Sequence, residues 1–494
     1  MSSDDATTEE TLAPGRLRTW TGALGAPLVF LVLWIAPLPL ERPAHHLAAV
    51  FAAVLVLWIT EVIPIAATAL LVAPLLVVCG VATPKEAFRH YADPLLYLFV
   101  GGFFMAEAMS KHGLDRRIAK AIVGAPWVGG RPARVRVAMI AGPALLSMWV
   151  SNTATAAIFV PILIGLLGKR GGDARGAAGS VLAVAYACSV GGLGTLVGSP
   201  PNLIAVRFLE EAGVSLGFVG WLAVGFPSAV ALAIAIHFVM RFLFPVASPK
   251  QGGHGDDGEP PWGRAFDDVP QAWRRGEIAT AVSFGLAVLG WTVPGFAQAL
   301  DLSLPDVLER LLEPGVVALL AASILFAIPD ASGGRVLGWR DATRIDWGII
   351  LLFGGGIALG TQLVDTGLAS VISRGFVELT GIRELWTFTA LCCLFTIFFT
   401  EICSNTASAN MLVPLVIAIA VELGVSPVPP ALAVGIAASC AFMLPIATGP
   451  NAIVYATGRV TQGQMIRAGF VLNVVSTLIV VALLRVLCPL LGWA

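Results

Sequence analysis

Charged residues are scarce in this 494-residue chain. They make up 12% of the sequence, whereas hydrophobic residues make up 57% and the mean hydropathy is +0.86. Soluble domains carry roughly 25% charged residues, because their outer surface faces water. Stretches such as 49–79 and 181–206 contain uncharged apolar runs of the length that membrane spans of about 20 residues require. The chain is therefore expected to be an integral membrane protein, with the lipid bilayer as its surroundings.

Several chemical signatures are missing as well. The seven cysteines are dispersed and form no CxxC pair, and the six histidines lack metal-ligand spacing, which argues against a disulfide framework or a zinc site. No GxxxxGK[ST] loop is present, so ATP-driven pumping is not expected. No nucleophile, metal cluster or acid–base pair suggests an enzyme, and a net charge of −1 gives no reason to expect nucleic-acid binding. Of the functional classes of membrane protein, a secondary transporter or a channel remains.

Polar segments divide the chain. Residues 1–20 are polar and acidic and lack the basic start of a signal peptide, so they are expected to form a disordered tail. The longest polar stretch, 246–275, is rich in Gly, Pro, Asp and Arg and predicts a linker between two halves, 21–245 and 276–494. The loop 111–136 contains seven basic residues and one acidic residue, which places it on the cytoplasmic side by the positive-inside rule.

The two halves repeat one another. The block 151–163, which begins Ser-Asn-Thr, returns at 404–416 with seven of thirteen positions identical. Gly-Ser-Pro-Pro-Asn at 198–202 returns as Ala-Thr-Gly-Pro-Asn at 447–451, and the Leu-Phe-Val-Gly-Gly block at 98–102 has its own counterpart. The three blocks recur in the same order at offsets of 253, 249 and 254 residues. This regularity indicates a duplicated membrane module.

Each half contains an overlong apolar segment and a proline break. The segments 137–168 and 386–420 are too long for one crossing, and each is interrupted by Ser-Asn-Thr, which predicts two re-entrant helical hairpins. Proline removes an amide donor, so the Pro-Asn blocks predict broken helices at about 180–207 and 430–457. Either motif alone could be helix-packing polarity or a proline kink. Their recurrence at matched positions favours a transporter's binding site in an all-α polytopic fold with two inverted repeats.

The Ser-Asn-Thr tips suit small ions. A buried anion must exchange its water for fixed donors, and hydroxyls, Asn amides and N–H groups at helix starts supply them without a buried cation. Sodium needs carbonyl and hydroxyl oxygens, which Asn and a hairpin tip also offer. Glu401, three residues before the second motif, could be a structural or a proton-linked carboxylate. The structural role is favoured, because Met148 occupies the corresponding position in the first half.

With these tandem motifs the chain resembles the divalent anion:sodium symporter family, the INDY-type dicarboxylate and citrate carriers, from about residue 45 onward. The resemblance implies a multi-pass protein of the cell membrane, in bacteria the inner membrane. It implies a homodimer whose protomers have a scaffold domain and a transport domain that moves as an elevator. It further implies sodium-coupled symport, and the absence of an added basic residue for a third carboxylate favours C4-dicarboxylates (succinate, malate, fumarate). Citrate or sulfate symport, dicarboxylate exchange, proton coupling and, from another class, an anion channel remain alternatives.

The resemblance also implies particular residues. The first sodium site would comprise Ser147, Ser151, Asn152 and Gly198. The second would comprise Thr400, Cys403 through its backbone, Asn405 and Ala447. The dicarboxylate would lie among Asn152, Thr153, Ser199, Ser404, Asn405, Thr406, Thr448 and Gly449. Gly449 departs from the family, which commonly has proline there, and this is expected to loosen the loop and to remove a ring from beside the substrate. Retention of Asn451 favours sodium coupling over exchange.

Overall fold

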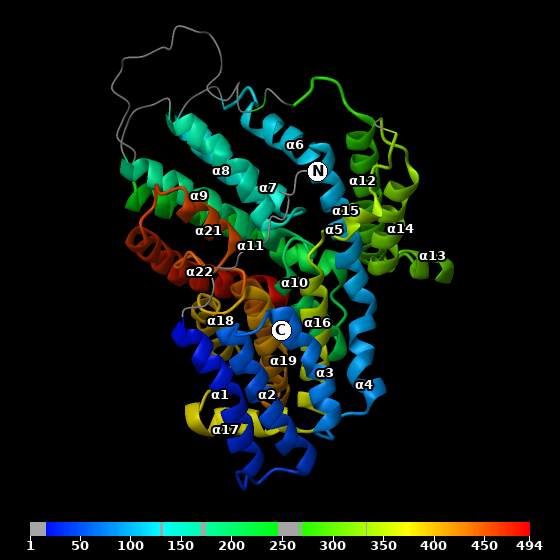
Figure 1. The fold of residues 1–494 in the computed structure, drawn as a ribbon, viewed down its shortest axis with the longest axis vertical. Helices are drawn as coiled ribbons and strands as arrows, with labels where there is room; N and C mark the ends of the chain where they lie inside the picture. The colour runs from blue at the N-terminus through cyan, green and yellow to red at the C-terminus, as the bar shows by residue number, and fades with distance from the viewer. Residues whose placement is uncertain (1–15, 129–131, 169–173, 246–265, 267–268, 332) are drawn as a thin grey trace, which may run out of the picture.

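The computed structural model describes the chain apart from residues 1–15, 129–131, 169–173, 246–265, 267–268 and 332. Every regular element in the described residues is a helix (Figure 1), so the all-α prediction is confirmed. Eight of the described helices are long and apolar enough to cross a membrane, or nine spans if one bent helix pair forms a single span. Most of the expected linker 246–275 lies outside the described residues, as do residues 1–15 of the expected tail.

The helices of the first half are α1 (Arg16–Ile35), α2 (Arg42–Thr60), α3 (Ile65–Val78), α4 (Pro84–Arg89), α5 (Pro94–His112), α6 (Leu114–Val123), α7 (Pro132–Ser147), α8 (Asn152–Gly168), α9 (Ala174–Gly191), α10 (Pro200–Glu211) and α11 (Gly217–Leu243), with short 3-10 turns η1 (His90–Ala92) and η2 (Gly192–Gly194). Those of the second half are α12 (Arg275–Ala299), α13 (Asp306–Leu311), α14 (Pro314–Ala327), α15 (Trp339–Ala342), α16 (Trp347–Asp365), α17 (Leu368–Thr380), α18 (Leu385–Phe399), α19 (Asn405–Glu422), α20 (Val428–Ala437), α21 (Gly449–Ala456) and α22 (Gln462–Leu490).

Both Ser-Asn-Thr motifs lie at breaks between paired helices. The first segment forms α7 and α8, with a short turn before Asn152, and the second forms α18 and α19, with a short turn before Asn405. Within each pair the two helices contact one another. The sequence interruptions therefore coincide with real helix ends, as a hairpin requires.

Both Pro-Asn blocks also begin a helix. Prolines occupy the first turn of α10 and of α21, where the missing N–H costs no intrahelical bond. The residue before each helix is extended, with φ −150° and ψ 136° at Ser199 and φ −145° and ψ 154° at Thr448. The backbone thus enters the helix after the break in the same way in both halves.

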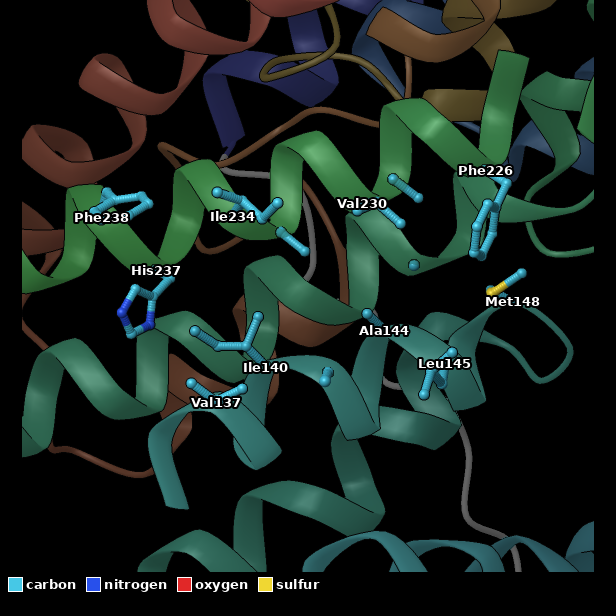
Figure 2. A pocket seen from close by; sticks show the side chains of 14 residues that line it. Val137, Ile140, Ala144, Leu145, Met148, Phe226, Val230, Ile234, His237 and Phe238 are labelled. Atoms are coloured by element: carbon cyan, nitrogen blue, oxygen red, sulfur yellow. The ribbon is translucent and has the colours of Figure 1, made fainter. Parts of the chain in front are cut away.

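Small and β-branched residues fill the centre of the molecule. Every residue of α20 is buried, and so are all from Val181 to the end of α9, because these helices have almost no bulky or charged side chains to hold neighbours away. A second hydrophobic cluster joins α2, α3, α16, α17 and the first half of α19. Elsewhere packing is incomplete: α7 packs mainly on α9, and an apolar cavity remains between α7 and α11 (Figure 2).

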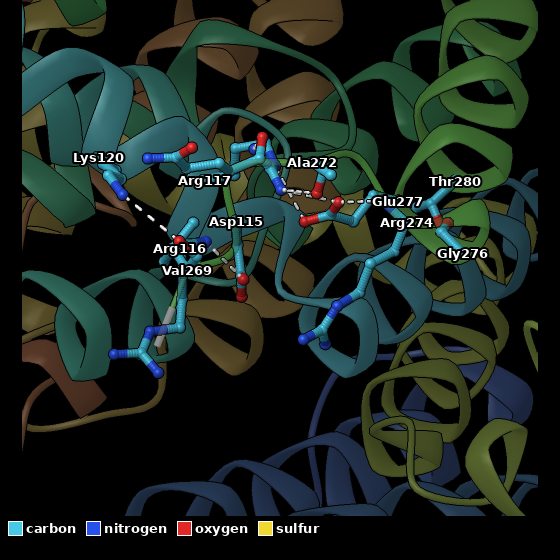
Figure 3. A network of polar contacts seen from close by, with 11 residues as sticks. Asp115, Arg116, Arg117, Lys120, Val269, Ala272, Arg274, Gly276, Glu277 and Thr280 are labelled. Atoms are coloured by element: carbon cyan, nitrogen blue, oxygen red, sulfur yellow. Dashed lines mark hydrogen bonds and ion pairs between the residues drawn. The ribbon is translucent and has the colours of Figure 1, made fainter. Parts of the chain in front are cut away.

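An ion-pair network ties the basic loop of the first half to the start of the second half (Figure 3). Nε of Arg117 lies 2.9 Å from the Glu277 carboxylate, which is only 1% exposed. Nη2 of Arg117 donates to Glu277 at 3.0 Å and to the carbonyl oxygen of Ala272 at 3.0 Å. The guanidinium also lies 4.8 Å from the centre of the Trp273 ring. This network fixes α6 against the N-terminus of α12.

Candidate functional site

The first hairpin tip brings hydroxyl, amide and carbonyl oxygens together. Ser147 Oγ donates to Asn152 Oδ1 at 2.6 Å, across the turn between α7 and α8. A Cβ atom added at Gly192 would lie 2.7 Å from that same Oδ1, and one at Gly198 would lie 2.6 Å from the Gly192 carbonyl oxygen. It would also lie 2.8 Å from the carbonyl oxygen of Met148. Glycine is required at both positions because only a backbone without side chains lets these oxygens approach.

The second tip repeats the arrangement. Thr400 Oγ1 lies 2.8 Å from Asn405 Oδ1 and 2.8 Å from the carbonyl oxygen of Ala438, so its proton can serve either acceptor. Thr400 and Asn405 stand 253 residues after Ser147 and Asn152. Their matching pairs show that the sequence repeat is also a repeat of hydrogen-bond geometry. Of the other predicted sodium residues, Cys403 is buried, Ala447 half-buried and Ser151 exposed.

The asparagine of each Pro-Asn block holds its own break together. Asn202 Nδ2 donates to the carbonyl oxygens of Gly192 and Thr195, both at 2.8 Å. Asn451 Nδ2 donates to the carbonyl oxygens of Ala441 at 3.1 Å and Leu444 at 3.0 Å, which stand 249 residues after Gly192 and Thr195. These bonds satisfy carbonyl groups that the interrupted helix leaves open. The motif is visible in the sequence, but this role of its asparagine is not.

The two halves meet at the start of the broken helices. Helix α8 packs on α21, and α19 packs on α10. A Cβ atom at Gly449 would lie 2.1 Å from Thr153 Oγ1, and Ser199 Oγ lies 2.9 Å from Ser439 Oγ. Gly449 has helical geometry and no positive φ, so close approach of Thr153 explains the glycine better than loop flexibility does.

The predicted substrate residues differ in exposure. Thr153 is exposed at the first tip, whereas Asn152, Ser404, Asn405, Thr448 and Gly449 are half-buried. Thr448 caps α21 by accepting from the backbone N–H of Asn451. Ser199 and Thr406 are buried, so a ligand would reach them only after a local rearrangement. Four helix N-termini, those of α8, α10, α19 and α21, carry these residues.

Glu401 braces the second break. Its Oε1 accepts from the backbone N–H groups of Phe442 and Met443 at 2.7 and 2.8 Å, and its Oε2 accepts from that of Leu444 at 3.1 Å. Asn473 Nδ2 donates to Oε1 at 2.9 Å. The carboxylate is 4% exposed and joins the hairpin turn to the break and to α22. All four partners are donors, which supports the structural interpretation of this residue.

Comparison with known proteins identifies a family of membrane transporters. Residues 17–494 match the family model of the sodium:sulfate symporter transmembrane region. The chain is 30% identical over 486 residues to the sodium-dependent dicarboxylate transporter SdcS of Staphylococcus aureus (strain USA300), covering 95% of this chain and 91% of that protein. It is 35% identical over 457 residues to an uncharacterized transporter of Haemophilus influenzae, covering 92% and 94%.

Among solved structures, the chain resembles the YdaH transporter of Alcanivorax borkumensis, whose crystal structure was described as revealing an unusual topology. The TM-score is 0.53 at 15% identity, and the match covers 82% of this chain and 87% of that one. At this level of identity the similarity supports the fold alone.

Proposed function

The chain belongs to the divalent anion:sodium symporter family, and from that premise we propose that it is a symporter that couples sodium entry to uptake of C4-dicarboxylates such as succinate, malate and fumarate. It is a multi-pass transporter of the cell membrane and not an enzyme. The observation that carries the proposal is the duplicated hydroxyl–asparagine pair, Ser147 with Asn152 and Thr400 with Asn405.

Each pair would contribute to one sodium site. Sodium is held in transporters by unwound backbone carbonyls and helix ends near the middle of the membrane. The first site would use Ser147, Asn152 and the backbone near Gly198, where these oxygens already approach one another. The second would use Thr400, Asn405 and the break that ends at Ala447. Uncharged oxygen ligands bind a monovalent cation weakly, which suits an ion that must be released after transport.

The dicarboxylate would bind at the helix N-termini between these sites. Unpaired N–H groups and the positive ends of helix dipoles stabilise anions there without a basic side chain. Thr153, Thr448 and the backbone at Gly449 lie where the first tip meets the second break, and they would contact the carboxylates. None of the side chains assigned to the site is charged, so two bound sodium ions would offset the two negative charges of the substrate.

The elevator movement and the homodimer belong to the same proposal. Buried residues of α16 and α19 belong to both hydrophobic clusters, so the division into scaffold and transport domains is inferred from membership of the family and not from core packing. Sodium binding would order the two tips first. The loaded domain would then move across the membrane, driven by the sodium gradient.

Radiolabelled succinate uptake into proteoliposomes tests the proposal. Accumulation should require an inward sodium gradient, and Asn152→Ala and Asn405→Ala should each abolish it. Exposed Asp306, on the surface helix α13, offers a matched control as Asp306→Asn. Competition by unlabelled citrate and sulfate in the same assay compares the alternative substrates. Sodium-dependent uptake unchanged in both asparagine variants would rule out this site, and uptake without sodium would rule out the coupling.

A further inference from the structure

The cavity between α7 and α11 lies outside the candidate site and has a volume of about 400 Å³. The two helices run antiparallel along it, so Val137 lies near His237 at one end and Met148 lies near Phe226 at the other (Figure 2). His237 is its only polar lining side chain. Small residues keep it open, among them Ala144, while large apolar side chains beside it remain exposed.

Positive charge gathers at the His237 end of this groove. Arg136 directly precedes Val137 on α7, and Arg241 stands one turn after His237 on α11. The two guanidinium groups act electrostatically on His237 and on one another. In the described parts of the chain no carboxylate forms an ion pair with either arginine, and no residue hydrogen bonds to the buried Nδ1 of His237. Within the described residues the groove is thus apolar with a cationic end that no carboxylate pairs.

The length of the groove fits one membrane leaflet. Met148 stands eleven positions after Val137, which at 1.5 Å per helical residue is about 16 Å. One leaflet is about 15 Å deep, half of a hydrocarbon core of about 30 Å. The cationic end adjoins the loop 111–136, whose basic residues indicate the cytoplasmic side. Basic pockets between membrane helices on that side bind anionic head groups.

We propose that the groove between α7 and α11 binds one anionic phospholipid, with an acyl chain along the groove and the phosphate against Arg136 and Arg241. A zwitterionic lipid would fill the groove equally well but would bring a choline or ethanolamine cation toward the two arginines. His237 lies where the head group joins the chains, and its ring lines the groove there. The far end of the acyl chain would pack against Met148, directly after Ser147, and so would support the first hairpin tip.

Native mass spectrometry of the full-length protein in detergent tests the head-group contact. The protein is titrated with dioleoyl phosphatidylglycerol or dioleoyl phosphatidylcholine. Arg136→Gln/Arg241→Gln should weaken retention of phosphatidylglycerol about tenfold or more and leave phosphatidylcholine unchanged, since each basic residue near an anionic surface contributes about 1 kcal/mol. The control is Arg310→Gln/Arg459→Gln, which removes two exposed arginines elsewhere. Equal loss in both double variants, or none in the first, would overturn the proposal.

A groove-filling variant tests the acyl contact separately. Ala233→Phe should occupy the space and lower phosphatidylglycerol retention while both arginines remain, whereas Leu286→Phe, at an exposed position of α12, should not. Ala141→Leu provides a smaller filling change if Ala233→Phe does not yield monodisperse protein. Unchanged retention in a folded filling variant would show that the groove is not the binding site. These outcomes concern lipid binding and are independent of which anion is transported.

Discussion

Removing the charge of Glu401 is the most informative single change in this protein. Glu401→Gln keeps the size of the side chain but replaces one carboxylate oxygen with an NH₂ group. If the amide oxygen takes the place of Oε1, the bonds from Phe442, Met443 and Asn473 persist in weaker form. The NH₂ group then faces the backbone N–H of Leu444, and a donor meets a donor.

The expected loss of stability can be worked from these four bonds. Hydrogen bonds to a charged group contribute about 1.5–3 kcal/mol and neutral ones about 0.5–1.5 kcal/mol, so three weakened bonds lose about 1 kcal/mol each. The unsatisfied N–H of Leu444 costs about 1–3 kcal/mol more. These losses total about 4–6 kcal/mol, and relief from the desolvation penalty of a buried ion, several kcal/mol, returns about 3 kcal/mol of them. A net destabilisation of about 1–3 kcal/mol follows.

Thermal unfolding with a sodium titration measures both effects of Glu401→Gln. The melting temperature should fall, and the sodium concentration that restores it should rise, because the break that Glu401 holds also carries Ala438 and Ala447, which lie beside the proposed second sodium site. Glu422→Gln, at the exposed end of α19, is the matched control. If the melting temperature of Glu401→Gln and its dependence on sodium concentration equalled those of the wild type, the structural role of Glu401 would be refuted. Loss of only the pH dependence of uptake would instead identify Glu401 as a proton-linked group.

Three further changes test other parts of the structure. Gly449→Ala should raise the succinate KM about tenfold, because the new Cβ would lie 2.1 Å from Thr153 Oγ1, and an unchanged KM would contradict this. Asn451→Ala should cost about 2–3 kcal/mol in thermal unfolding, since two carbonyl groups lose their donor; a loss under 0.5 kcal/mol would contradict this. Arg117→Gln should cost about 3–5 kcal/mol by leaving Glu277 buried without its partner, and adding Glu277→Gln should restore part of the melting temperature.

Features encoded within a short segment could be predicted from the sequence. Proline in a first turn and an extended residue before it are local properties, so the breaks near Ser199 and Thr448 followed from the Pro-Asn blocks. The hydrogen bond between Ser147 and Asn152 is equally local, but the two residues are expected near one another only through the family resemblance. Contacts between distant segments were beyond such reasoning. Nothing near Ser199 in the sequence indicates that its hydroxyl meets Ser439, 240 residues away.

A difference between the repeats at the two breaks shows what duplication alone cannot specify. In the first half, Met148 offers only its backbone carbonyl to the break, and Thr195 Oγ1 donates to it at 2.5 Å. In the second half, Glu401 takes that place and receives three backbone N–H groups instead. The counterpart of Thr195 is Leu444, which has no hydroxyl to donate. At these corresponding positions the break is therefore tied to its own hairpin by a threonine hydroxyl in one half and by a carboxylate in the other, where the Thr400 hydroxyl also reaches the carbonyl oxygen of Ala438. Because a carboxylate brings negative charge close to the second tip and a methionine does not, the two proposed sodium sites should differ in affinity, with the second binding sodium more tightly.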